Sequence, residues 1–284
     1  MNACSESVLF IHKMCTCFAV YNSRPIYGMN FDFPDVPLRF VIETGRRGEV
    51  FHLSFGYEDE FWETSGMNRA GLFVSGQILA ATFEIQPNPH EALVHPHEIF
   101  VRALHHARRV EEVPELICGR RLAYTTRRKG HQFYAGRDGQ ALIVEPGPQG
   151  NVLTWPREPF AVMTNFPVWD TVGKPIDAVT GVGSNRYKTA HRMITANRAQ
   201  FGIQEAFATL QSTAMQKGAY TTQSSMVCDP LAGEVYIAVR RDYNRIWRVS
   251  LADKTISTFA GFKGAVKLPL HETGISDAIL ARYN

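Results

Sequence analysis

The sequence predicts an α+β fold in a single domain. Short apolar runs bounded by turn residues, which are typical of β-strands, recur along most of the 284 residues. Helical periodicity occurs in two places, at 96–117 and from Ile203 onward. This order of strands, helices, strands, helix and strands indicates helices layered on sheets, and nothing in it favours a doubly wound parallel sheet. No internal repeat or flexible linker divides the chain.

The composition is that of an ordinary globular protein. The residues are 45% hydrophobic, 11% aromatic and 20% charged, which excludes disorder, coiled coil and collagen. The formal charge of +3 is spread along the chain and gives no case for a nucleic-acid or membrane partner. No window reaches the roughly 18 to 20 apolar residues of a membrane span, and the apolar run at 8–11 is too short for a signal-peptide core. We therefore expect a cytoplasmic protein, in which an odd count of 5 cysteines favours free thiols.

Strands are expected where apolar runs lie between turn residues. Asn22–Pro25 has the composition of a hairpin turn and predicts a strand on either side of it. Asp138-Gly139 marks a second tight turn. The further predicted strands are Leu38–Ile42, Val50–Phe55, Leu72–Leu79, Leu122–Thr126, Gln132–Ala135, Ala141–Glu145, Val152–Trp155, Phe160–Thr164, Met226–Cys228, Val235–Val239 and Ile246–Ser250.

The helical segments carry apolar stripes. Within 96–109, the residues Phe100, Leu104 and Ala107 fall at i, i+4 and i+7 and so share one helix face. Three basic side chains then face outward or flank that stripe: His105, Arg108 and Arg109. A short second helix is expected at Val110–Ile117 with Pro114 in its first turn, where proline is tolerated. The later helix carries the stripe Phe207, Leu210 and Ala214.

Several motif-like fragments do not indicate a function. His90 and His95 are one residue too far apart for the zinc-binding face of a His-Glu-x-x-His helix. Gly181–Ser184 is only a fragment of a dinucleotide fingerprint, and the sequence has no P-loop and no Gly-x-Ser-x-Gly elbow. The basic runs Arg127–Lys129 and Arg240-Arg241 are typical of solvated turns or strand ends.

Cys15 and Asp32 form a candidate catalytic pair. Cys15 opens the first predicted strand, and Asp32 ends the strand that would return beside it, so we expect them to lie close together. A thiol attacks an amide only after a base removes its proton, and no histidine lies between Cys15 and Asp32 in the sequence. An α-amine, with a pKa of about 7.7 to 8.0, could serve as the base if Cys15 were the first residue. Two other interpretations stay open from the residues alone: a buried strand cysteine, and a metal ligand acting together with Cys17.

A series of short segments runs in a recognisable order along most of the chain. They are Cys15-Thr16 before an apolar strand, Gly28–Asp32, Gly66–Leu72 with Ser75–Ile78 after it, Asp138–Glu145, Met163–Pro167, Ser184–Tyr187 and Tyr220–Thr222. The order resembles that of the choloylglycine hydrolase family of cysteine N-terminal nucleophile hydrolases, which includes bile salt hydrolases and penicillin V acylases. The resemblance implies a four-layer αββα sandwich of antiparallel sheets.

The same resemblance implies a role for each of five residues. Cys15 would be the nucleophile and, through its freed amine, the base, while Asp32 would position the amine. The Asn165 side-chain amide and the backbone N–H of Ile78 would donate to the oxyanion of the tetrahedral intermediate. The fixed charge of Arg186 would favour the thiolate.

Two departures from the family pattern bear on specificity and assembly. Met29 stands where the family has arginine, which predicts altered thiol electrostatics or substrate contacts and a specificity other than for bile salts. The segment between Asn165 and Arg186 is shorter than in bile salt hydrolases, which place a tetramer-forming excursion there. We therefore expect a homo-oligomer smaller than that tetramer, with a dimer favoured.

The function implied by the resemblance is that of an amidase. It would hydrolyse the linear carbon–nitrogen amide bond of an N-acylated small molecule through an acyl-Cys15 thioester that water resolves. No cofactor and no functional metal are expected, because one residue supplies both nucleophile and base. Two alternatives stay open: an acyltransferase of the same fold, and a non-catalytic small-molecule-binding protein in which Met29 is a sign of decay.

Maturation is expected to remove residues 1–14, an upstream segment or propeptide, and to leave 15–284 as a single domain. While that segment is attached, the Cys15 nitrogen is an amide with no basic lone pair. Either autoproteolysis of the Met14–Cys15 bond, or translation from Met14 followed by removal of that methionine, would expose the amine. The second route is favoured because Met14 immediately precedes Cys15 and because cysteine is small.

Overall fold

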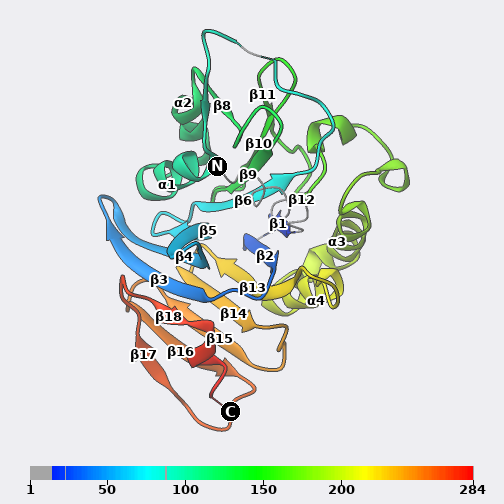
Figure 1. Ribbon diagram of the computed structural model, residues 1–284. Helices are drawn as coiled ribbons and strands as arrows, with labels where there is room; N and C mark the ends of the chain where they lie inside the picture. Colours follow the sequence, from blue (N-terminus) through cyan, green and yellow to red (C-terminus); the bar gives the residue numbers. More distant parts are fainter. Residues whose placement is uncertain (1–14, 23, 87, 284) are drawn as a thin grey trace.

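Two antiparallel sheets packed face to face form the centre of the molecule, and helices lie on their outer sides (Figure 1). The structure, a computed structural model, describes residues 15–22, 24–86 and 88–283. Within these residues each large sheet has eight strands. The predicted upstream segment 1–14 lies outside the described residues.

The first sheet contains β1 and β2, the two strands next to Cys15, near one of its edges. In spatial order its strands are β12 (Phe160–Met163), β1 (Thr16–Val20), β2 (Ile26–Phe33), β13 (Thr221–Asp229), β14 (Glu234–Val239), β15 (Ile246–Ser250), β16 (Thr255–Ala260) and β17 (Lys267–Pro269). The second sheet runs β11 (Asn151–Thr154), β10 (Ala141–Pro146), β9 (Lys129–Ala135), β6 (Phe73–Leu79), β5 (Glu60–Asn68), β4 (Gly48–Tyr57), β3 (Leu38–Gly45) and β18 (Ile275–Ser276). A short parallel pair joins β7 (Ala92–Val94) to β8 (Arg120–Leu122).

The helices belong to opposite outer layers. Figure 1 shows α1 and α2 on the side of the second sheet and α3 and α4 on the side of the first. The α-helices are α1 (Pro96–His106), α2 (Val113–Ile117), α3 (Ser184–Asn197), α4 (Ile203–Thr213) and α5 (Asp277–Leu280). The 3₁₀ helices are η1 (Val110–Glu112), η2 (Val168–Thr171), η3 (Ile176–Ala178) and η4 (Arg198–Gln200).

Three hydrophobic cores hold these layers together. The central core lies between the sheets, a second lies under α1 and α2, and a third under α3 and α4. Strand β1 shows the alternation that this requires: Cys17 and Ala19 enter the central core, whereas Phe18 and Val20 enter the core beneath α3 and α4. The predicted four-layer αββα sandwich of antiparallel sheets is therefore confirmed.

The hairpin expected around Asn22–Pro25 is confirmed, and it fixes the register next to Cys15. Strand β1 pairs with β2 so that Thr16 lies opposite Asn30 and Phe18 opposite Gly28. A Cβ atom on Gly28 would lie 2.1 Å from the Phe18 ring, so only glycine lets that ring lie across β2. Gly28 thus allows Phe18 to fill the outer core while the opposite face of β1 turns toward the second sheet.

Most predicted elements are confirmed, and the differences have local causes. The strand expected at Leu122–Thr126 is wrong beyond Leu122, because Tyr124 and Thr125 donate their backbone N–H groups to Arg128 in a turn. Helix α3 was not predicted, since only three of its residues are buried and its apolar stripe is weak: Arg186, Ala190 and Ile194. Pro114 lies in the first turn of α2, as expected. No helix in the described ranges is long and apolar enough to cross a membrane.

Candidate active site

Cys15 lies immediately before β1, on the face of the first sheet that turns toward the second. The residue is 3% exposed and lines a pocket whose wall comes from strands of both sheets and from α1. Six aromatic side chains contribute to the wall of this pocket: Phe31, Phe55, Tyr57, Trp62, Phe100 and Tyr124. The buried thiol therefore faces a largely apolar cavity that can hold the hydrocarbon part of a small molecule.

Arg186 connects the predicted site residues. Its Nη1 donates to the Cys15 carbonyl oxygen at 2.5 Å and to Thr16 Oγ1 at 2.8 Å, and its Nη2 donates to Asn165 Oδ1 at 2.8 Å. Nη1 also lies 3.8 Å from Asp32 Oδ2. Burial lowers the pKa of this arginine, an effect that the nearby Asp32 partly offsets. One buried guanidinium thus brings together Cys15, Asp32 and Asn165, which lie far apart in the sequence.

The turn before α3 leaves room for that guanidinium. Gly183 precedes the helix with φ +84°, in the left-handed region that glycine adopts readily. A Cβ atom on Gly183 would lie 2.7 Å from Arg186 Nη2. A larger residue at this position would therefore displace the arginine from Asn165.

The Asn165 amide has one orientation in this site, because an arginine can only donate hydrogen bonds. Arg186 occupies Oδ1, so the Nδ2 group turns the other way and donates to the Ile78 carbonyl oxygen at 2.9 Å. A strand residue directs its N–H and C=O to the same side, so the Ile78 N–H also faces Asn165. The structure thus brings Asn165 and Ile78, the two residues expected to donate to the oxyanion, into contact through this hydrogen bond.

The loop that carries Asn165 is anchored at both ends. The Asn165 carbonyl oxygen accepts a hydrogen bond from the Ala80 backbone at 2.7 Å. Val168, three residues after Asn165, and Trp169 each donate a backbone N–H to the buried Glu145 carboxylate at 3.0 Å. His131 contacts the same carboxylate at 2.9 Å. These contacts assign Glu145, part of a recognised segment without a predicted role, to holding the loop that positions Asn165.

Asp32 is fully buried and only partly hydrogen-bonded. Its Oδ1 accepts from Thr222 Oγ1 at 2.5 Å. Among the described residues, no donor makes a hydrogen bond to Oδ2. Burial raises the pKa of Asp32 from 3.8 to about 7, although Arg186 and Thr222 act in the opposite direction. A cationic donor next to Oδ2 would satisfy this carboxylate, and the α-amine of a chain beginning at Cys15 would be such a donor.

Cys17 lies one side chain further along the same face and has a different environment. It is completely buried and is not part of the pocket wall. Burial raises the pKa of its thiol well above the ordinary range, and the nearby Cys15 raises it further. Cys17 therefore stays protonated and belongs to the core, whereas Cys15 lines the pocket.

Solved structures share this arrangement of layers. A variant of conjugated bile acid hydrolase from Clostridium perfringens aligns with a TM-score of 0.65 and 16% identity over 87% of this chain and 97% of its own. Penicillin V acylase from Agrobacterium tumefaciens gives 0.62 and 16% over 92% and 100%. The Caenorhabditis elegans ortholog of N-acylethanolamine-hydrolyzing acid amidase gives 0.55 and 16% over 76% and 93%. This chain has the N-terminal nucleophile hydrolase fold.

The sequence resemblance to the choloylglycine hydrolase family is thus matched by the fold of these neighbours. No protein-family model matches the sequence, and no curated protein matches it. At 16% identity the shared N-terminal nucleophile hydrolase fold shows the architecture, and the chemistry must be argued from this chain's own site.

Met29 shows how this version of the fold accommodates the missing arginine. Its side chain is completely buried in the central core, opposite Cys17 on one neighbouring strand and Met226 on the other. A charged group would lack water there, whereas the apolar thioether packs well. The positive charge next to the Cys15 carbonyl oxygen is that of Arg186.

Two asparagines of the recognised segments have structural roles in this N-terminal nucleophile hydrolase fold. Asn30 donates to the Leu210 carbonyl at 2.8 Å and so ties β2 to α4. Asn68 accepts from Leu72 at 3.2 Å and donates to the Ala107 carbonyl at 2.8 Å, which ties the turn after β5 to the end of α1. These residues position the sheets and do not face the pocket.

The raised pKa of Asp32 predicts a pH-dependent stability while residues 1–14 remain attached. The folded carboxyl holds its proton up to about pH 7, whereas the unfolded chain loses it near 3.8, so the stabilisation is complete below 3.8 and is lost as the pH rises through 7. A shift of this size corresponds to at most about 4 kcal/mol. Denaturant unfolding at pH 5 and pH 8 should show this decrease, and Asp32→Asn should remove it.

Asp35→Asn provides the matched control, since Asp35 is an exposed carboxylate on the same segment. This control should keep the full pH dependence. Exposing the Cys15 amine should reduce the pH dependence of stability, because an ammonium group next to Asp32 lowers the pKa of that carboxyl group. An unchanged pH dependence in Asp32→Asn would show that another group titrates.

Proposed function

We propose that the protein is an amidase that hydrolyses the linear carbon–nitrogen bond of an N-acylated small molecule through an acyl-Cys15 thioester. The observation that carries this proposal is the set of contacts made by Arg186, which holds the Cys15 backbone, Asn165 and Asp32 around the end of an apolar pocket. Known activities of the fold neighbours agree with it, since their names describe hydrolases or acylases of amides.

The proposed reaction uses one residue as nucleophile and base. The Cys15 amine takes the thiol proton, and the sulfur attacks the amide carbonyl carbon. The oxyanion that forms is stabilised by Asn165 Nδ2 and the Ile78 N–H. The protonated amine then gives its proton to the leaving nitrogen, the carbon–nitrogen bond breaks, and water attacks the thioester with the same amine as base. The products are a carboxylic acid and an amine, and the thiol is restored.

The pocket wall supports an apolar acyl group and a polar contact beside it. The aromatic side chains favour a hydrocarbon or aryl acyl portion. Gln77 lines the same pocket and is 3% exposed, and neither its Nε2 nor its Oε1 hydrogen-bonds to a group within the described ranges. A primary amide offers both a donor and an acceptor, which matches the C=O and N–H of a secondary amide. Gln77 is therefore the group that we assign to orienting the scissile amide.

A substrate panel tests the proposal. Conjugated bile acids, penicillin V, N-acylethanolamines, N-acyl homoserine lactones and N-acyl amino acids present the same bond with different acyl and amine parts. Release of a free amine from at least one of them, lost on alkylation of Cys15, supports an amidase. Binding of the compounds without amine release would support a non-catalytic binding protein. Transfer of the acyl group to an added amine, in preference to water, would identify an acyltransferase.

Asn165→Ala is expected to lower the acylation rate by about 10²- to 10³-fold, the usual cost of one oxyanion donor. Single-turnover kinetics measure that rate, and the melting temperature checks the fold. Asn197→Ala is the matched control, because Asn197 makes a local hydrogen bond to the Met193 carbonyl at the other end of α3. Equal acylation rates in the two variants would show that Asn165 does not donate to the oxyanion.

The assembly and location of the protein stay predictions. We propose a homodimer in the cytoplasm, on the grounds given by the sequence. Light scattering of the purified protein measures its mass in solution, and a tetramer would contradict the proposed role of the shortened segment between Asn165 and Arg186.

A further inference from the structure

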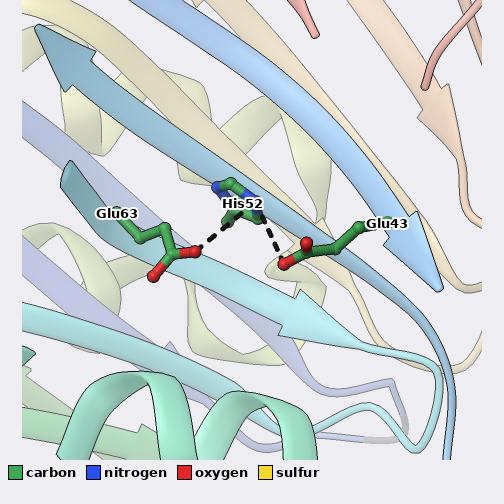
Figure 2. A group of neighbouring side chains, drawn as sticks. All are labelled: Glu43, His52 and Glu63. Atoms are coloured by element: carbon green, nitrogen blue, oxygen red, sulfur yellow. Dashed lines mark ion pairs between the residues drawn. The ribbon is translucent and has the colours of Figure 1, made fainter. Parts of the chain in front are cut away.

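A second cluster of titratable side chains lies on the outer face of the second sheet and does not include Cys15. Glu43 lies on β3, His52 on β4 and Glu63 on β5. Figure 2 shows the His52 ring between the two carboxylates. Their nearest oxygen and nitrogen atoms all lie within 4.8 Å of one another, the one such group of possible metal ligands in the part of the chain that the structure describes.

Strand register and a β-bulge bring these three side chains to one face. His52 pairs with Val41 on β3, so Glu43, two residues on, projects from the same side. On β5 the pairing shifts between Ser65 and Glu63, which leaves Thr64 as the extra residue of a bulge. The bulge turns Glu63 toward His52, in the way that bulges commonly re-aim side chains near functional sites.

The distances between these atoms are also compatible with ligands that share one small metal ion. His52 Nε2 lies 3.4 Å from Glu43 Oε1 and 3.8 Å from Glu63 Oε1. Ligands about 2.0 to 2.1 Å from a tetrahedral zinc ion lie about 3.3 Å from one another. The other ring nitrogen, His52 Nδ1, lies 2.8 Å from Ser54 Oγ, which provides the outer contact that metal-binding histidines usually make.

Two more histidines extend the cluster from α1. His105 Nε2 lies 3.0 Å from Glu43 Oε1, and His97 Nε2 lies 3.1 Å from Glu63 Oε2. All four of these atoms are buried, yet within the described residues none of them makes a hydrogen bond of acceptable geometry. His52 itself has only 7% of its side chain exposed. These carboxylate and imidazole atoms are at ion-pair distance without well-aligned hydrogen bonds, and a cation among them would complete their coordination.

From these contacts we propose that Glu43, His52 and Glu63 bind one divalent transition-metal ion, with zinc the best match, and that His97 and His105 lie close enough to complete its coordination. Imidazole nitrogen and carboxylate oxygen are the donor set that zinc accepts. The site is separate from Cys15 and does not depend on the proposed amidase chemistry.

The position of the cluster gives the ion a definite structural effect. Glu63 and His97 also line the pocket that contains Cys15. An ion held here would join β3, β4, β5 and α1 and would fix the part of the pocket wall that Glu63 and His97 form. Its expected effects are therefore on stability and on substrate affinity, with the nucleophile and base still supplied by Cys15.

Titration with zinc chloride after chelator treatment tests the proposal, on the Cys15→Ala protein so that the reactive thiol cannot bind the metal. Calorimetry should give one zinc ion per chain, and saturation should raise the melting temperature by at least about 5 °C. His52→Ala and the near-isosteric Glu63→Gln should each weaken binding by at least about 100-fold. His90→Ala, a change at an exposed histidine, should bind as the parent does.

Cobalt(II) provides the second readout, because its spectrum distinguishes ligand types. A site of nitrogen and oxygen ligands should give visible bands without a thiolate charge-transfer band. A folded protein that binds no zinc, or that binds it equally well after both substitutions, would overturn the proposal and leave the cluster as an ion-pair network. Either result leaves the amidase assignment untouched, since amine release is measured separately.

Discussion

Replacing Cys15 with alanine is expected to lower kcat/KM by at least about 10⁴-fold, the scale at which loss of a nucleophile removes catalysis. The reason is local: Cys15 is the cysteine that both lines the pocket and has its carbonyl held by Arg186. Alanine keeps the backbone and nearly the same volume, so the fold should persist. Amine release from the best substrate of the panel measures the effect, and the melting temperature confirms folding.

Cys17→Ala is the matched control for that experiment. Cys17 lies on the same strand and face but is enclosed in the core, where burial raises the pKa of its thiol. Its removal should cost about 1 to 2 kcal/mol of stability through lost packing and should leave most of the activity. An inactive Cys17→Ala protein beside an active Cys15→Ala protein would show that the register of the nucleophile is wrong.

The second large effect concerns the amine of Cys15. A chain that begins at Cys15 is expected to be at least about 10²-fold more active than one with a segment still attached, because general-base catalysis contributes about 10²- to 10⁴-fold. While a peptide bond precedes Cys15, its nitrogen cannot accept the thiol proton, and Asp32 Oδ2 has no hydrogen-bond donor among the described residues. A precursor with a protease site before Cys15 allows activity to be measured before and after cleavage.

The control for that experiment is a precursor whose cleavage leaves one glycine before Cys15. It has the same thiol and a free amine, but the amine is displaced by one residue from the position beside Asp32. We expect this product to stay close to the uncleaved activity. Full activity with the extra glycine, or before cleavage, would falsify the assignment of the amine as base.

The sequence predicts the fold well where one local pattern decides the outcome. The hairpin around Asn22–Pro25 and the helix that carries Phe100 and Leu104 need only turn composition and one apolar stripe, and the structure has both. An apolar stripe does not predict helix α3, because the most important buried residue of this helix is the charged Arg186. Its burial depends on partners from other segments, which periodicity cannot show.

The residues of the candidate site were likewise predicted only in part. The resemblance to a known family named Cys15, Asp32, Asn165 and Arg186, and the structure brings them together through the hydrogen bonds of one guanidinium. It gave no role to Glu145, whose carboxylate anchors the loop after Asn165. Such a contact depends on the packing of two distant segments and leaves no short sequence signal.

The cluster around His52 was beyond sequence reasoning for a similar reason. Its three central residues come from three strands, with spacings of nine and eleven positions that match no metal-binding motif. They meet because the strands pair in a particular register and because Thr64 forms a bulge. His105, expected to face outward or flank the apolar stripe, is half-buried against Glu43.

The central claim is that Cys15 forms a covalent thioester through the sulfur of an N-terminal residue. The most direct measurement is peptide mapping by mass spectrometry of the mature protein, quenched in acid during turnover of its best substrate. We predict a first peptide that begins at Cys15, carries the mass of the acyl group and loses it on treatment with hydroxylamine. An acyl group found on any other residue, or an active protein that shows no acylated Cys15 while a burst of amine is released, would contradict the account.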